Sequence, residues 1–162
     1  MDTLPISAVG VRWGAVLAAA MIVYGLGFRA ARLDYRSLWG WGFYVMPPLA
    51  AVAAQLWLGR AADDLSFGGG LALAAVVTIV GSSAYGIFVF LYNRFVDDSL
   101  IRTVVADRVQ QLEVSVAAPE KRARSIARVR SLGRAAPFAA LVTLQLVVVS
   151  LVVAAVATLF TT

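Results

Sequence analysis

The chain has 162 residues, of which 61% are hydrophobic and only 14% are charged, whereas a soluble domain carries about 25% charged residues. Cysteine and histidine are both absent, which excludes disulfide bonds, thiolate or imidazole metal ligands, and catalysis by Ser-His or Cys-His groups. We attribute the formal net charge of +5 to membrane topology and anionic lipid headgroups rather than to nucleic-acid binding, because the chain is so apolar.

Four apolar segments are long enough to cross a bilayer, which requires about 20 residues of helix. They cover residues 9–28, 42–59, 67–93 and 137–160, and none of them contains Asp, Glu or Lys. We expect helices because hydrocarbon offers backbone polar groups no hydrogen-bond partner. The sequence therefore predicts an all-α fold, an integral membrane four-helix bundle that forms a single domain over residues 1–162.

Small residues recur at intervals of four on the first and third predicted spans. They are Gly10, Gly14 and Ala18 on the first, and Gly70, Ala74, Thr78, Ser82 and Gly86 on the third. Such faces let helix backbones approach closely in lipid. We expect these faces to pack within the bundle, and docking of another subunit or of a second copy remains the alternative.

The connection between the third and fourth spans, residues 97–134, is the only long segment outside the predicted spans. Apolar residues recur in its first half at helical spacing, at Ile101, Val105, Val109, Leu112 and Val116. We expect an amphipathic helix that is capped by Asp97 or Asp98 and ends at Pro119, followed by a basic helix from Glu120 to about Arg134. The connection is thus predicted to form a cytoplasmic helical arm.

Six basic residues line the second half of this arm: Lys121, Arg122, Arg124, Arg128, Arg130 and Arg134. Basic side chains beside a membrane are attracted to anionic headgroups. We expect them to contact membrane lipid, and recognition of a cytoplasmic protein is the alternative.

The distribution of positive charge predicts the orientation. Arg12 and Arg60 lie on one side of the four spans, and the other twelve of the fourteen Lys and Arg residues lie on the opposite side. Positively charged loops stay in the cytoplasm. Both termini are therefore expected outside the cytoplasm.

Apart from Arg12, near the start of the first span, the polar residues inside the spans are uncharged. Gln55, Tyr85 and Gln145 are expected to form hydrogen bonds between helices, and a small-molecule or lipid pocket around the three is the sharper alternative. No catalytic, cofactor or metal site is predicted. An enzyme acting on lipid would have to use adjacent acids, Asp63 with Asp64 or Asp97 with Asp98, which more often cap helices.

Several short motifs are familiar in their order along the chain. Tyr24-Gly25 lies in the first span, Leu65-Ser66-Phe67-Gly68 precedes the third, and Tyr92-Asn93 and Val96-Asp97 mark its end. With the proline-led final span, this order resembles the bacterial membrane family catalogued as domain of unknown function 4199. The resemblance implies a four-span bacterial membrane protein and no assigned activity.

Small size and the lack of a catalytic constellation favour a non-enzymatic protein of the bacterial cytoplasmic (inner) membrane, an accessory or scaffold subunit of a larger membrane complex. Partners would be lipids and either a larger complex or further copies of the chain. The alternative is a small oligomeric transporter or channel-like protein, disfavoured by the absence of an acid or base within the spans. A lipid-acting enzyme is the third possibility.

Overall fold

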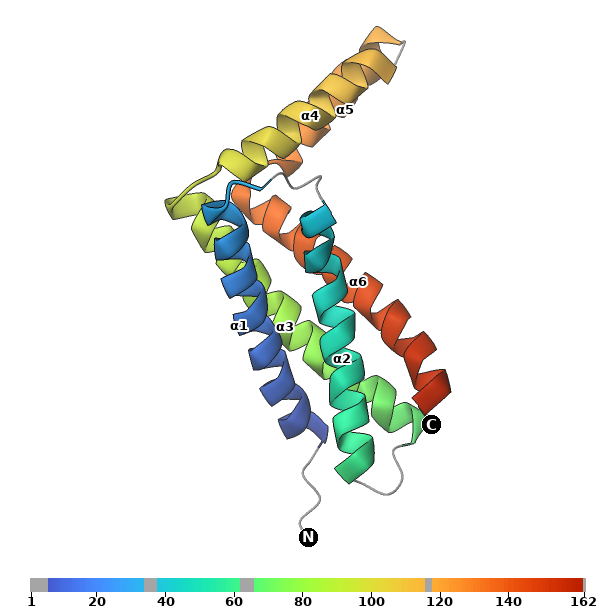
Figure 1. The fold of residues 1–162 in the computed structure, drawn as a ribbon. Helices are drawn as coiled ribbons and strands as arrows, with labels where there is room; N and C mark the ends of the chain where they lie inside the picture. The colour runs from blue at the N-terminus through green and yellow to red at the C-terminus, as the bar shows by residue number, and fades with distance from the viewer. Residues whose placement is uncertain (1–5, 34–37, 62–65, 116–117, 162) are drawn as a thin grey trace. The chain divides into compact units, whose positions relative to one another are not determined.

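The computed structural model describes residues 6–33, 38–61, 66–115 and 118–161, and within these ranges it contains helices and no strand. The elements are α1 (Ile6–Ala30), a short 3-10 helix η1 (Leu38–Trp41), α2 (Gly42–Ala61), α3 (Phe67–Phe95), α4 (Ser99–Ser115), α5 (Pro119–Leu132) and α6 (Ala135–Thr161). Figure 1 shows them in chain order. The all-α prediction is therefore confirmed.

Four of these helices are long and apolar enough to cross a membrane: α1, residues Gly42–Gly59 of α2, α3, and residues Ala135–Leu159 of α6. Their most apolar windows have mean hydropathies between 1.2, in α2, and 2.6, in α6. The four expected spans are thus present. The helices extend a few residues beyond the predicted limits, since α1 begins at Ile6 and α3 ends at Phe95.

The chain forms two compact units. The span unit contains Met1–Tyr85 and Thr143–Thr162, and the hairpin unit contains Gly86–Val142. Within the span unit, α1, α2, the first part of α3 and the last part of α6 run in alternating directions (Figure 1). Consequently α1 begins at the same end of this unit as that at which α6 finishes.

Small residues bring α1 and α3 into close contact. A Cβ atom on Gly10 would lie 2.8 Å from Val76 Cβ, and one on Gly14 would lie 2.7 Å from Val80 Cβ. Real Cβ atoms do not approach so closely, so each glycine of α1 makes room for a valine of α3. The close approach lets the two helices attract each other through dispersion contacts, since the hydrophobic effect does not drive helices together within lipid.

An aromatic cluster joins three helices of the span unit. Phe43 of α2 makes edge-to-face contacts with Tyr24 and Phe28 of α1, at centroid distances of 4.9 and 5.6 Å. It stacks on Tyr85 of α3 at 5.7 Å. Aromatic pairs of this geometry add about 0.5–1.5 kcal/mol each beyond the area that they bury. The cluster therefore fixes α1, α2 and α3 together near the beginning of α2.

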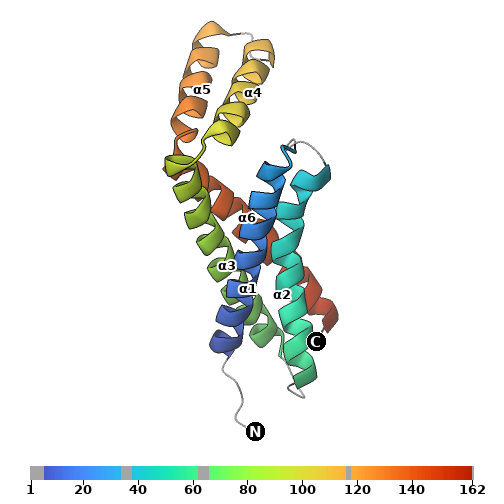
Figure 2. The same cartoon turned by 60° about the vertical axis from the view of Figure 1, so that its left-hand side comes forward.

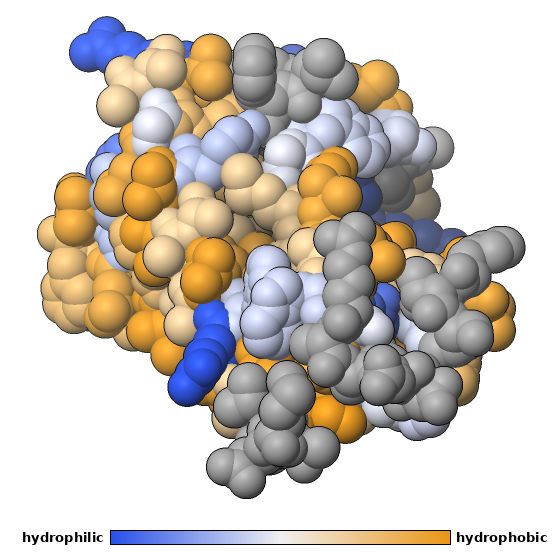
Figure 3. Space-filling model, turned by 60° about the horizontal axis from the view of Figure 1, so that its bottom comes forward, coloured by the Kyte–Doolittle hydropathy of each residue, from blue (hydrophilic) through white to orange (hydrophobic). Residues whose placement is uncertain are grey.

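Large apolar side chains face outward. On α6, the buried residues of the span unit recur at intervals of four, at Leu146, Ser150, Ala154 and Thr158, whereas Leu144, Val152 and Leu159 are each at least 60% exposed. Figure 3 shows apolar side chains over much of the surface seen from the end where α1 begins. Exposed apolar surface on this scale is typical of helices that face hydrocarbon or another protein.

In the hairpin unit, α4 and α5 pack together as an antiparallel pair, named the hairpin below (Figure 2). Asp97 lies two residues before α4, and its carboxylate accepts bonds from the Ser99 N–H at 2.9 Å and the Ser99 hydroxyl at 2.7 Å. Asp98 pairs instead with Arg102, at 2.8 Å. The two adjacent acids thus stabilise the first turn of α4.

Pro119 corrects one expectation. It was expected to end the first helix of the connection, with the second helix beginning at Glu120, whereas in the structure Pro119 is itself the first residue of α5. Proline is suited to that position because the first amides of a helix have no intrahelical acceptor and its φ is already helical. The second helix of the connection therefore begins one residue earlier than expected.

Replacement of Gly14 by alanine tests the contact between α1 and α3. The new methyl group would also meet the Val77 carbonyl oxygen at 3.1 Å, and this backbone atom cannot rotate away. We expect Gly14→Ala to lower the free energy of unfolding by about 1–3 kcal/mol, measured by titration with denaturing detergent and followed by tryptophan fluorescence.

Gly27→Ala is the matched control on the same helix, since nothing lies within 4 Å of the Cβ that it would add. This variant should unfold at the same detergent fraction as the wild type or at a slightly higher one. Equal behaviour of the two variants would contradict the close packing of Gly14.

Candidate functional site

The predicted small-residue faces are buried. All eight residues are buried in the isolated chain: Gly10, Gly14, Ala18, Gly70, Ala74, Thr78, Ser82 and Gly86. Gly10 and Gly14 lie against Val76 and Val80 of the same chain. These faces are therefore occupied by contacts within the chain and do not form its outer surface.

A polar node links three helices near the end of the span unit where α6 finishes. Gln55 of α2 donates from Nε2 to the Gly70 carbonyl oxygen of α3 and to Thr158 Oγ1 of α6, both at 2.9 Å. Thr158 in turn donates to the Ala154 carbonyl oxygen at 2.6 Å. Gln55 is 2% exposed, so the node is closed to solvent.

The sequence singled out Gln55 but grouped it with different residues. Gln145 is exposed on α6, whereas Gln55 and Tyr85 are buried. Thr158 was the partner that sequence reasoning missed. The distance of each residue from its helix end could have indicated this pairing, since Gln55, Gly70 and Thr158 all lie within six residues of helix ends at one end of the span unit.

The node holds helices together and offers little chemistry. All its donors are neutral, and Gln55 Oε1 has no hydrogen-bond partner among the described residues. Within those residues, no group of three acidic side chains could hold a metal ion. The arrangement is typical of interhelical hydrogen bonding.

The hairpin turns its apolar side inward. Ile101 is 5% exposed, and Val105, Val109 and Leu112 are half-buried on the same side of α4. A Cβ atom on Gly133, at the end of α5, would collide with a methyl group of Val105. The predicted apolar stripe of α4 is therefore covered by α5 over this length and is not free to bind a partner.

The basic residues form the outer side of the hairpin. Five of the six predicted contact residues are exposed: Lys121, Arg124, Arg128, Arg130 and Arg134. Arg122 is half-buried. Arg134 lies beyond the end of α5 at Leu132, so it is separated from the other five and belongs to a second feature.

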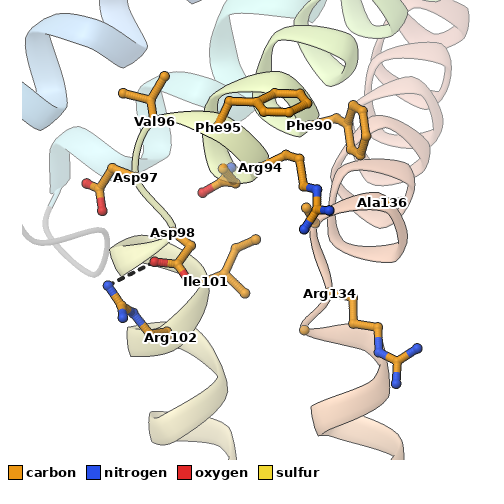
Figure 4. Close-up of a pocket in the computed structure, with 13 residues that line it drawn as sticks. Phe90, Arg94, Phe95, Val96, Asp97, Asp98, Ile101, Arg102, Arg134 and Ala136 are labelled. Atoms are coloured by element: carbon orange, nitrogen blue, oxygen red, sulfur yellow. Dashed lines mark ion pairs between the residues drawn. The ribbon is translucent and has the colours of Figure 1, made fainter.

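That feature is a cavity of about 670 Å³ at the base of the hairpin, lined only by residues of the hairpin unit. The last turn of α3, the start of α4 and the joint between α5 and α6 surround it. Figure 4 shows Arg94 extending from α3 toward Ala136 at the beginning of α6, with Arg134 just before the same helix. In the sequence, Arg94 had been considered only as one of the twelve basic residues that predict the orientation.

The acids considered for lipid chemistry are engaged in structure. Asp97 and Asp98 line this cavity, the first bonded to Ser99 and the second paired with Arg102. Asp63 and Asp64 lie outside the described residues.

A double-mutant cycle tests the polar node. Gln55→Leu alone also removes the unpartnered Oε1, so its single effect understates the bond. We expect Gln55→Leu and Thr158→Val together to show a coupling energy of about 0.6–1.7 kcal/mol in detergent unfolding.

Gln145→Leu serves as the control, since Gln145 is exposed on α6 and should be replaceable without loss of stability. A coupling energy of zero between Gln55 and Thr158 would show that their hydrogen bond contributes nothing to the fold.

Comparison with known proteins identifies a family. A family model described as protein of unknown function (DUF4199) matches residues 10–162. No curated protein and no solved structure matches the chain. The match covers nearly the whole chain and confirms the resemblance noted in the sequence, so the chain belongs to the DUF4199 family.

Proposed function

We propose that the chain is a non-enzymatic accessory or scaffold subunit of a larger complex in the bacterial cytoplasmic membrane. The hairpin of α4 and α5 would be its cytoplasmic docking element, and both termini would lie outside. One observation carries this proposal. The hairpin closes its apolar side on itself, with Ile101 buried and Val105 against Gly133, and exposes a basic side.

The surface of the spans supports the assignment of docking to the hairpin. The small-residue faces are occupied within the chain, and the outward residues of α6 are large and apolar, as at Val152 and Leu159. Lipid covers such a surface as well as protein would, and its uniform apolar side chains offer a partner few specific contacts. The exposed cations are the surface most able to distinguish one partner from another.

Charge indicates the partner's chemistry. The exposed face of α5 carries Lys121, Arg124, Arg128 and Arg130, with Glu120 as the only acid in that helix. An acidic protein surface would complement it and would accelerate association, an effect that salt should weaken. We therefore propose a partner with an acidic cytoplasmic face.

The orientation can be tested by labelling, because the chain contains no cysteine and gives no background. Ser7 in α1 and Ser131 in α5 are both exposed. A membrane-impermeant maleimide should label Ser7→Cys in intact cells, and Ser131→Cys only after the membrane is opened. The reverse pattern would contradict the proposed orientation.

The docking role is tested by gentle detergent extraction, native-gel sizing and mass spectrometry of the proteins that accompany the chain. We expect a stoichiometric partner with the wild type, and loss of most of it with Arg124→Glu/Arg128→Glu, because two exposed attractive charges become repulsive.

Arg108→Glu is the control, a charge reversal at an exposed residue of α4 that should leave the partner bound. A wild-type chain that migrates alone, or a partner insensitive to the α5 reversals, would contradict the proposal.

A further inference from the structure

We propose that the cavity at the base of the hairpin binds the phosphate group of a membrane phospholipid, with Arg94 and Arg134 as its ligands. The inference requires only that α3 and α6 cross a membrane. It does not depend on the proposed protein partner, and it concerns different residues from those of the exposed α5 face.

The position of the cavity along the helices matches that of lipid phosphates. Arg94 is the second-last residue of α3, whose candidate span is Phe67–Phe95, and Arg134 directly precedes the candidate span Ala135–Leu159. Both arginines therefore lie at the limits of the apolar segments. In a bilayer, the groups at such limits are at the level of the headgroups.

The two acids that line the cavity are engaged by other residues, so the side chains of Arg94 and Arg134 can bind an anion. Three arginines and two aspartates line it, but Asp98 is paired with Arg102 at 2.8 Å and Asp97 is bonded to Ser99. No hydrogen bond or ion pair joins the guanidinium group of Arg94 or Arg134 to another described residue. A guanidinium group matches the geometry of phosphate and binds it through two parallel hydrogen bonds.

The cavity wall also has an apolar part. Phe90 and Ile101 contribute to it, and Phe95 and Val96, beside Arg94, are 74% and 69% exposed (Figure 4). A soluble phosphate compound would leave this apolar part of the wall uncovered. The glycerol and upper acyl chains of a phospholipid would cover it while the phosphate contacts the arginines.

The backbone adds donors at the same place. The first hydrogen bond of α6 runs from the Phe138 N–H to the Arg134 carbonyl oxygen at 3.0 Å, so the amides of Ala135 and Ala136 precede the helical ladder. Both residues line the cavity. The positive end of α6 therefore complements the cavity's net positive side chains and favours an anionic phospholipid.

The test is native mass spectrometry of the full chain in detergent, titrated with phosphatidylglycerol. The wild type should retain one phospholipid molecule. We expect Arg94→Gln/Arg134→Gln to weaken its apparent affinity about thirtyfold, and Arg134→Gln alone about fivefold. Arg134 lies outside the helices and is exposed, so the single variant preserves the fold even if the double variant does not.

Arg124→Gln/Arg128→Gln removes the same charge from exposed residues of α5 and should leave this lipid bound. Unchanged affinity in the Arg134→Gln variant, or an equal loss in the α5 variant, would overturn the proposal. Competition with inorganic phosphate shows whether the cavity binds a phospholipid or free phosphate. It should fail to displace the lipid at millimolar concentration, and complete displacement would overturn the assignment to a phospholipid.

Discussion

Lipid hydrocarbon competes with every apolar contact in the span unit, and this competition decides which side chains lie inside. A leucine or valine gains nothing by leaving lipid for the protein interior. Contacts between helices must therefore come from close approach, and the positions that allow it are Gly10, Gly14 and Gly81, against Val76, Val80 and Leu17. The outward valines of α6 follow from the same rule, because lipid satisfies them as well as protein would.

A buried polar group that finds a partner on another helix also helps to fix how the helices are arranged. Gln55 is 2% exposed and its amide cannot reach water, so it bonds to Gly70 and Thr158 and thereby connects α2, α3 and α6. An apolar side chain could slide along a neighbouring helix at little cost, whereas a hydrogen bond fixes both depth and rotation. One residue therefore contributes to the register of three helices.

The sequence predicted what bilayer thickness and charge dictate, namely four apolar helices and a basic connection, because these depend on local composition. It could not predict contacts that depend on how distant segments meet. Thr158 lies 103 residues from Gln55, and Arg94 and Arg134 are separated by α4 and α5. The position of Pro119 as the first residue of α5 was not predicted either, since a proline can follow the end of one helix or begin the next.

The base cavity and the hairpin are connected through the backbone. Arg94 stands just before the joint that leads into α4, and Arg134 stands in the joint between α5 and α6. A phosphate held by both arginines would tie the end of α3 to the start of α6 and would restrict the two joints from which the hairpin extends. Lipid bound there would reduce the conformational freedom of the hairpin before a partner arrives, and a surface that is already ordered loses less entropy on binding. The proposed lipid site would in this way favour docking on α5 without touching the docking face.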